Sequence, residues 1–171
     1  MDFPLSNTDQ NSTLSREQIE RVYELYKDGQ FKEAISQIKA LNEIYPNIPF
    51  LFNLIGACYK SLGQLDRAVK MFQIAVSIKH DYVEAHKNLG TTLKELGRLD
   101  ESVESFMNAI EIDPSYVDAH YNLGNAFKQL NRFNESVKSY KTAIAIDPNF
   151  SQAHINLGNV QKDLNQLDDA L

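Results

Sequence analysis

The sequence predicts an all-α protein, a right-handed solenoid of stacked antiparallel helix pairs. The first observation is a repeated phrase, because AHYNLG at residues 119–124 recurs as AHKNLG at 85–90 and as AHINLG at 153–158. Equivalent residues therefore lie 34 positions apart, a period typical of solenoid repeats. Turn-forming residues and apolar residues recur in the same frame. One helix pair cannot bury both of its faces, so the copies are expected to stack.

The repeat frame starts at residues 15, 49, 83, 117 and 151 and needs no insertion. It divides the chain into a polar segment over residues 1–14, which we expect to be flexible, and a repeat array over residues 15–171. The fifth copy is truncated, because the sequence stops in what would be the first turn of its second helix. We therefore expect a longer parent protein and an uncapped C-terminal end that is available for self-association. Its apolar residues without a partner are Leu167, Ala170 and Leu171.

Each copy is expected to contain two helices joined by a tight turn. The first helix should end at position 15 of the copy, where glycine or asparagine tolerates a left-handed conformation. These residues are Gly29, Gly63, Gly97, Asn131 and Asn165. The second helix should be finished before the prolines that follow it, which are Pro46, Pro114 and Pro148.

Helix caps are predicted from short polar residues in the same frame. Such side chains accept hydrogen bonds from the unpaired N–H groups of the first helical turn. The expected caps of the second helices are Asp66, Asp100, Asn134 and Asp168. The expected caps of the first helices are Asn47, Asp81, Ser115 and Asn149. Asp81 with Glu84, and Asn149 with Gln152, have the spacing of a capping box.

Two side-chain patterns mark the predicted core. On each first helix, positions 3, 7, 10, 11 and 14 of the copy gather into one apolar arc at about 100° per residue. On the second helices a large aromatic residue precedes an alanine by three positions, which lets neighbouring helices interlock at about 8–10 Å. These pairs are Phe72 with Ala75, Phe106 with Ala109, and Tyr140 with Ala143. Cys58 lies on the apolar arc, so we expect a small core residue rather than a nucleophile.

Composition and charge exclude several classes of function. A chain of 171 residues with 43% hydrophobic and 23% charged residues can form a core beneath a polar surface. Its net charge of -6 and its dispersed lysines and arginines disfavour a nucleic-acid partner. We find no signal peptide, no membrane-length apolar run and no catalytic or phosphate-binding motif. We therefore expect a cytoplasmic chain that is not an enzyme, needs no cofactor and does not contact a membrane.

The recurring histidines do not predict a metal site. His86, His120 and His154 occupy equivalent positions, so in a stacked array they lie about 10 Å apart, the diameter of a helix. The ligands of one zinc ion must lie within about 3–4 Å of each other. We expect three rings at the edge of the core, each with a solvated nitrogen, and no bound metal.

The recurring positions resemble the tetratricopeptide repeat over residues 15–171. The resemblance rests on the glycine column, on the small and aromatic residues of the second helix, and on the proline after it: Gly56, Gly90, Gly124, Gly158, Ala68, Phe72, Ala75 and Pro114. The signature tryptophan is replaced by Phe52 and then by histidines, and Ser102 and Ser136 stand where alanine is usual. The resemblance implies a superhelix whose first helices line a concave groove that binds extended peptide segments.

Asparagines on the arc opposite the predicted core are the main candidate site. Asn88, Asn122 and Asn156 form one column, and Asn125 and Asn159 extend it. The column resembles the asparagine ladder in the repeat arm of O-GlcNAc transferase-like proteins. A side-chain amide can pair with both the N–H and the C=O of a bound backbone. The alternative is that these amides bond to neighbouring helices within the array.

Other residues on the same arc complete the candidate groove: Lys87, Lys94, Lys128 and Tyr121. Lys94 and Lys128 belong to a lysine column with Lys60 and Lys162, which either attracts an acidic partner or only complements the helix dipole. Because Glu20 and Leu54 interrupt the asparagine column, the first two copies are not expected to grip a backbone in the same way.

Two functions follow from this pattern. The first is a non-catalytic scaffold that binds an extended or acidic segment of a protein or peptide in its concave groove. The second is a substrate-recognition arm of a larger enzyme, such as a glycosyltransferase, with its catalytic domain beyond Leu171. The fold alone does not identify the partner.

Overall fold

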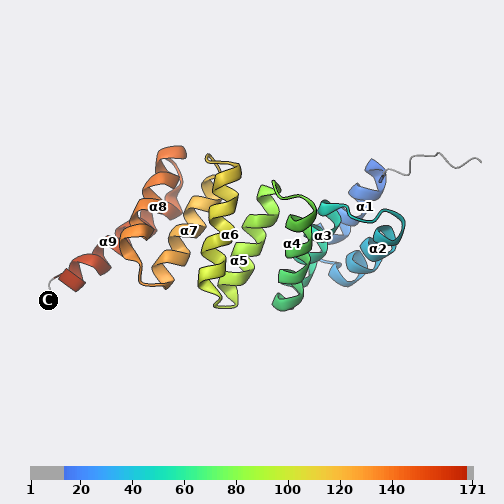
Figure 1. The fold of residues 1–171 in the computed structure, drawn as a ribbon, viewed down its shortest axis with the longest axis horizontal. Helices are drawn as coiled ribbons and strands as arrows, with labels where there is room; N and C mark the ends of the chain where they lie inside the picture. The colour runs from blue at the N-terminus through green and yellow to red at the C-terminus, as the bar shows by residue number, and fades with distance from the viewer. Residues whose placement is uncertain (1–13, 169–171) are drawn as a thin grey trace, which may run out of the picture.

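The computed structural model describes residues 14–168 of the chain. Within this range it contains nine α-helices, which follow one another in a row along the long axis of the molecule (Figure 1). The predicted all-α solenoid is confirmed. The expectations for residues 1–13, for Ala170 and Leu171, and for the side chain of Leu167 lie outside what is described.

Helices of the first kind begin 34 residues apart from α3 onward. They are α1 (Arg16–Lys27), α3 (Pro49–Ser61), α5 (Val83–Glu95), α7 (Val117–Gln129) and α9 (Ser151–Asp168). The second helices are α2 (Phe31–Ile44), α4 (Leu65–Ile78), α6 (Leu99–Ile112) and α8 (Phe133–Ile146).

The helices form two layers of different spacing. The first helices contact each other directly, α1 with α3, α3 with α5 and α5 with α7. Each second helix from α4 onward packs between the first helices on either side of it, as α6 does between α5 and α7. Because the first helices are the more closely spaced layer, the array curves towards them, so their layer is the concave side and the second helices form the convex side.

The turn inside each of the first four repeats ends the first helix as predicted. Gly29, Gly63, Gly97 and Asn131 have positive φ angles of 74°, 71°, 76° and 58°. At the end of α3, the N–H of Gly63 donates to the carbonyl of Lys60, and the N–H of Gln64 donates to that of Tyr59. This paired pattern is a Schellman motif, which satisfies carbonyls that the helix end would leave free.

The predicted caps of the second helices are wrong. The N-caps are Gln64, Arg98 and Arg132, and none of them makes a side-chain capping bond. The Schellman motif uses the residue after the glycine, and the next helix starts at once, so Asp66 lies inside the first turn of α4. The same shift places Asp100 inside α6 and Asn134 inside α8, while Asp168 ends α9.

The predicted caps of the first helices are also wrong, because these helices start later. Ile48, Tyr82 and Tyr116 are the N-caps of α3, α5 and α7, with no side-chain capping bond, so neither Asp81 nor Ser115 caps a helix. Asn47 instead has a positive φ of 64° and forms part of the turn.

The aspartates that end α6 and α8 explain this shift. The Asp113 carboxylate accepts from the N–H of Ser115 at 2.9 Å, and Asp147 accepts from the N–H of Asn149 at 3.0 Å. Both predicted caps are therefore turn residues, held by a carboxylate two positions earlier. A third correction concerns Asn165, since α9 continues through it to Asp168.

The glycine column lets the two helices of a repeat approach closely. A methyl group on Gly56 would lie 2.6 Å from the Phe72 ring, and one on Gly124 would lie 2.6 Å from the Tyr140 ring. The aromatic residues Phe72, Phe106 and Tyr140 are fully buried, as predicted. Cys58 is also fully buried, and burial raises the pKa of its thiol to about 11, which is the environment of a core residue.

Serines connect the two helices of one repeat, and histidines connect each repeat to the loop before it. Ser102 and Ser136, which stand where alanine is usual, donate to the carbonyls of Gly90 and Gly124 at 2.7 and 2.8 Å. The three recurring histidines each bond through Nε2 to a backbone carbonyl six residues earlier at 2.9 Å; they are His86, His120 and His154. Each ring thus fastens the start of a first helix to the preceding loop. The expectation of a solvated nitrogen is wrong for His86, whose Nδ1 is buried without a hydrogen-bond partner among the described residues. Within the described residues, no His, Cys, Asp and Glu side chains gather as a metal site would require.

Candidate protein-binding groove

A groove of about 700 Å³ lies on the concave face between α1, α3 and α5. Its wall includes the aromatic side chains of Tyr23, Tyr26, Phe50 and Tyr82 and the apolar side chain of Leu54. Tyr23 is 46% exposed, so much of its ring faces solvent. Aromatic side chains of this kind, apolar with a polar tip, are enriched where proteins bind other proteins. We call this region the aromatic half of the groove.

Asn88 joins the aromatic half through bonds inside the array. Its Nδ2 donates to Oδ1 of Asn53 at 3.1 Å, and Asn53 Nδ2 donates to the hydroxyl of Tyr82 at 3.4 Å. Asn53 is only 9% exposed, so these bonds satisfy a polar group that would otherwise be buried without a partner. The described structure gives no partner to Asn88 Oδ1.

The concave face of α7 and α9 carries a second network of amides. Asn156 Nδ2 donates to Oδ1 of Asn125 at 3.0 Å and to the Tyr121 hydroxyl at 3.2 Å. The same Asn125 oxygen accepts from the buried Tyr140 hydroxyl at 2.7 Å. Asn159 is exposed on α9. We call this region, with Asn122, the amide half of the groove.

Each of the two interpretations of the asparagine column therefore holds for a different set of side-chain atoms. The NH₂ groups of Asn88 and Asn156 bond to the neighbouring repeat, as the structural alternative predicts. Asn125 serves the fold, because its oxygen joins α7 to both α8 and α9. The carbonyl oxygens of Asn88 and Asn156 stay available, and an amide oxygen can only accept hydrogen bonds.

Two of the four lysines in the column pair with a carboxylate of the next repeat. Lys60 pairs with Glu95 of the next repeat at 2.9 Å, and Lys128 pairs with Asp163 at 3.8 Å. The residue of the next repeat equivalent to these carboxylates is Gln129 in the case of Lys94, and it carries no charge. Among the described residues, no carboxylate lies within ion-pairing distance of the Lys94 ammonium.

Lys94 lies between the two halves of the groove. Its Nζ donates to Oδ1 of Asn122 at 3.4 Å, and Asn122 Nδ2 donates to the carbonyl of Asp118. Burial lowers the pKa of Lys94 below its ordinary value, because a partly desolvated ammonium is less favourable than a neutral amine. Glu95 opposes this shift and Lys60 adds to it.

Lys87 has a local partner as well. Its ammonium contacts Oε1 of Glu84 at 2.6 Å, while the Tyr116 hydroxyl donates to Oε2 of the same carboxylate at 2.6 Å. Burial and this bond to Glu84 both raise the pKa of Tyr116. Glu84 thus joins α5 to the start of α7, and Lys87 balances its charge.

Sequence reasoning found the amide half and missed the aromatic half. Tyr23, Tyr26 and Phe50 lie on the same arc as the asparagines, so the helical wheel contained this signal. Because they do not recur from copy to copy, the repeat pattern does not single them out. Lys94 differs from Lys60 and Lys128 only in its partner across the repeats, which the lysine column by itself does not indicate.

Comparison with protein families identifies the repeat. Sequence models described as "TPR repeat" match residues 90–131 and 124–165, and one described as "Tetratricopeptide repeat" matches residues 51–82. Together these matches cover more than half of the chain. The chain belongs to the tetratricopeptide repeat family. This repeat fold supports a protein–protein interaction scaffold and is typical of non-catalytic chains.

Solved structures of the same fold are similar over most of the chain. MamA from Desulfovibrio magneticus RS-1 is 19% identical with a TM-score of 0.81, and the match covers 91% of this chain and 88% of that one. The Arabidopsis OM64 TPR domain is 19% identical with a TM-score of 0.66, over 67% of this chain and 95% of that one. The first TPR of Spaghetti (RPAP3), bound to the HSP90 peptide SRMEEVD, has a TM-score of 0.67 at 19% identity, over 68% and 93%.

A curated relative matches a shorter part of the chain. Anaphase-promoting complex subunit 3 of Dictyostelium discoideum is 35% identical over 54 residues, which is 32% of this chain and 6% of that protein. The chain thus aligns with only a small part of that relative. None of the described helices has the length and apolar character that crossing a bilayer requires.

Proposed function

We propose that this chain is a non-catalytic scaffold that binds an extended protein or peptide segment along its concave face. The observation that carries the proposal is the order of chemistry along the first helices. An aromatic groove between α1, α3 and α5 leads to Lys94 at the end of α5, which has no ion pair among the described residues, and amide side chains follow on α7 and α9. Each feature suits a different part of an extended chain.

The aromatic half would hold an apolar side chain of the partner. The groove has the volume of a ligand pocket, about 700 Å³, and Tyr23, Tyr26 and Phe50 offer ring surface that the core does not fully use. Burial of a single large apolar side chain is worth about 1.5–3 kcal/mol. This half would therefore supply much of the affinity.

Lys94 would bind a carboxylate of the partner. A half-buried ammonium without an ion pair is costly to the free protein, and an incoming carboxylate would remove part of that cost. Lys60, Lys87 and Lys128 already have carboxylate partners, so a single acidic group suffices. A domain of the same fold, the first TPR of Spaghetti (RPAP3), binds the carboxylate-rich HSP90 peptide SRMEEVD.

The asparagine column would hold the partner's backbone, from Asn88 in the aromatic half to Asn156 in the amide half. Asn88 and Asn156 use their NH₂ groups inside the array, so they would accept hydrogen bonds from backbone N–H groups. Such bonds are independent of the partner's sequence. In this proposal specificity comes from the aromatic half and Lys94, and register comes from the amides.

An array of extended peptides of about 15 residues, varied in apolar and acidic content, tests this function with the whole chain. Tyr23→Ser should weaken the apolar anchor, and Lys94→Gln should weaken carboxylate binding, each by about tenfold. Matched controls are Lys128→Gln, whose charge is already paired, and Asn108→Ala on the outer face. The proposal fails if bound peptides show no apolar and acidic preference, or if the controls weaken binding as much as the test variants.

A further inference from the structure

A second groove lies on the convex face between α6 and α8, away from the concave site. Its volume is about 760 Å³. The floor is apolar and formed by Val103 and Ile110 of α6 and by Leu123 and Phe127 of α7. Met107 projects from α6 at the edge and is 54% exposed, although it is a large apolar side chain.

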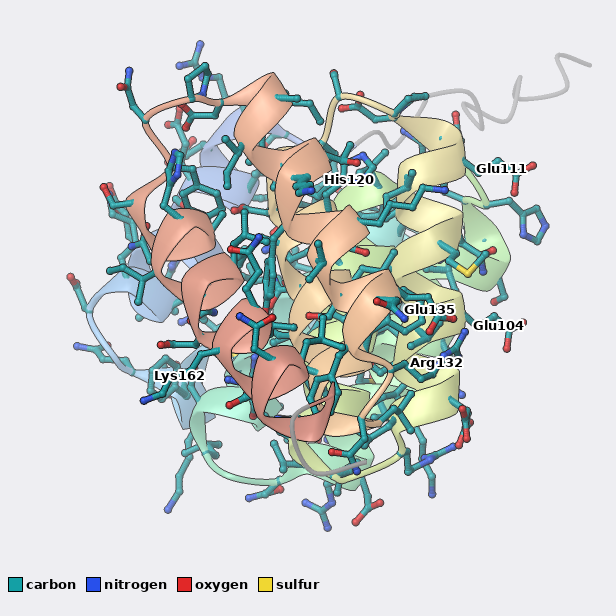
Figure 2. All side chains as sticks on the ribbon, turned by 90° about the vertical axis from the view of Figure 1, so that its left-hand side faces the viewer. Glu104, Glu111, His120, Arg132, Glu135 and Lys162 are labelled. Atoms are coloured by element: carbon teal, nitrogen blue, oxygen red, sulfur yellow. The ribbon has the colours of Figure 1, made fainter. Side chains whose placement is uncertain are left out.

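The walls of this groove carry unlike charges. Asp100, Glu104 and Glu111 line the α6 side. The α8 side carries Arg132, Glu135 and Lys138, so the charged side chains of the groove are four carboxylates and two cations. Arg132 pairs with Glu135, and its guanidinium also lies 4.5 Å from the centre of the Phe127 ring. Within the described residues, Glu104 and Glu111 have no ion pair. In Figure 2 the labelled Glu104, Glu111, Arg132 and Glu135 lie on the right of the view, and Lys162 lies at the lower left.

The exposed residues on the α6 side of this groove differ from those at the equivalent positions of α4 and α8. Asp100, Glu104, Met107 and Glu111 are spaced four, three and four residues apart, so they form one stripe along the helix. At the positions of Glu104, Met107 and Glu111, α4 has Lys70, Gln73 and Ser77, and α8 has Lys138, Lys141 and Ala145. All of these residues are exposed, so packing of the repeat does not dictate the difference.

We propose that this convex groove binds a basic amphipathic helix of a partner protein. The α6 and α8 helices occupy equivalent places in successive repeats, which leaves a straight trough between them. From Asp100 to Glu111 the stripe extends about 16 Å, or three turns of a helix. An apolar stripe on the incoming helix covers Met107 and the floor, and its flanking lysines or arginines meet Glu104 and Glu111.

The negative charge of the α6 wall favours a basic partner over a second copy of this chain. The whole chain has a net charge of -6, so a second copy of it would bring further negative charge to the acidic wall. A basic partner gains both electrostatic attraction and burial of Met107, a flexible side chain that adapts its shape to an apolar surface. This proposal uses none of the concave residues and stands independently of the function proposed for them.

The test is a displayed library of random peptides of about 16 residues, selected against the full chain. Selected peptides should carry apolar residues at helical spacing flanked by lysine or arginine. Glu104→Lys with Met107→Lys should raise their Kd about tenfold or more. This variant gives α6 the lysines that α8 already has at the equivalent positions, so the fold should tolerate it.

The matched control is Asp66→Lys with Gln73→Lys on α4. It also replaces one carboxylate and one neutral side chain by lysines, so the change in net charge is the same. Binding should change by less than about twofold. The proposal is overturned if both variants weaken binding equally, if neither does, if selection enriches no basic amphipathic peptide, or if Lys94→Gln abolishes binding.

Discussion

The two halves of the concave face have the same backbone geometry and different surface chemistry. Phe50 and Leu54 on α3 belong to an aromatic groove, whereas the equivalent positions on α9 hold Gln152 and Asn156. The helices pack equally closely on α3 and α7, because a methyl group added to Gly56 would lie 2.6 Å from the Phe72 ring and one added to Gly124 would lie 2.6 Å from the Tyr140 ring. The positions that build the solenoid therefore recur, and the positions that face the groove vary from copy to copy.

The largest expected effect tests whether a glycine packs equally closely against a buried aromatic ring in both halves. Gly56→Ala and Gly124→Ala each place a methyl group 2.6 Å from a fully buried aromatic ring. Overpacking of this kind costs about 1–3 kcal/mol, and we expect values near the upper end in both halves. Urea denaturation of each variant measures the loss in the free energy of unfolding.

The control for this prediction is Gly158→Ala on α9. No described atom lies within 4 Å of the added methyl group there. Alanine favours a helix over glycine by about 1 kcal/mol, so this variant should be as stable as the wild type or more so. Equal losses at Gly124 and Gly158 would show that helix packing does not explain the glycine column.

A smaller effect tests the structural role of Asn125 in the amide half. Asn125→Ala removes the acceptor of the buried Tyr140 hydroxyl and of Asn156 Nδ2. An unpaired buried hydroxyl costs about 1–3 kcal/mol, and we expect the lower end because Asn156 is partly exposed. Thermal unfolding followed by circular dichroism measures the loss.

Adding Tyr140→Phe to that variant should recover part of the stability. The double variant reproduces the second copy, where Ala57 and Phe72 occupy the two positions and no hydroxyl needs a partner. A double variant less stable than Asn125→Ala alone would contradict the role assigned to the Tyr140 hydroxyl.

A still smaller effect concerns the serines that replace alanine in the later repeats. Ala34 and Ala68 hold this position in the first two copies, and Ser102 and Ser136 hold it in the next two. Ser136→Ala removes one buried hydrogen bond to the Gly124 carbonyl, with an expected loss of about 0.5–1.5 kcal/mol. Ala68→Ser provides the reverse change. A loss larger than that of Asn125→Ala would mean that the serine does more than tie two helices together.

The smallest effect depends on pH and concerns Lys94, which separates the two halves. Because burial lowers its pKa in the folded state, the unfolded chain binds more protons as the pH rises towards 10.5. The cost of the ammonium is complete at neutral pH, begins to fall as the pH passes the folded-state pKa, and is gone above the unfolded-state value of 10.5. The Lys94→Met variant should therefore have a larger free energy of unfolding than the wild type at neutral pH. This difference should shrink at high pH. Denaturation of both proteins at several pH values tests this prediction. A difference in the free energy of unfolding that grows with pH would contradict it.

The fold could be predicted almost entirely from the sequence, because glycine, alanine and aromatic residues recur wherever helices touch. Helix starts could not, since a short polar residue before a helix is compatible with either a cap or a turn. At two helix starts the outcome depends on Asp113 and Asp147, which lie two residues before the predicted caps and hold those residues in a turn.

The candidate site was predicted in part. The amides lie on the concave face as expected, but which of their atoms stay available depends on Asn53, Tyr82 and Tyr121 across the repeats. The pairing of the lysines likewise depends on contacts between repeats. The alternative function, a recognition arm of a larger enzyme, uses the same concave groove and stays a prediction.

The most direct test of the concave site is an NMR titration of the isotope-labelled full chain with the tightest peptide from the extended-peptide array. Signals of the Asn88 and Asn156 side-chain amides and of the Tyr23 ring should shift together at one Kd, because the segment spans both halves. Shifts confined to the outer faces of α4, α6 and α8, with the concave amides unchanged, would contradict the proposed function.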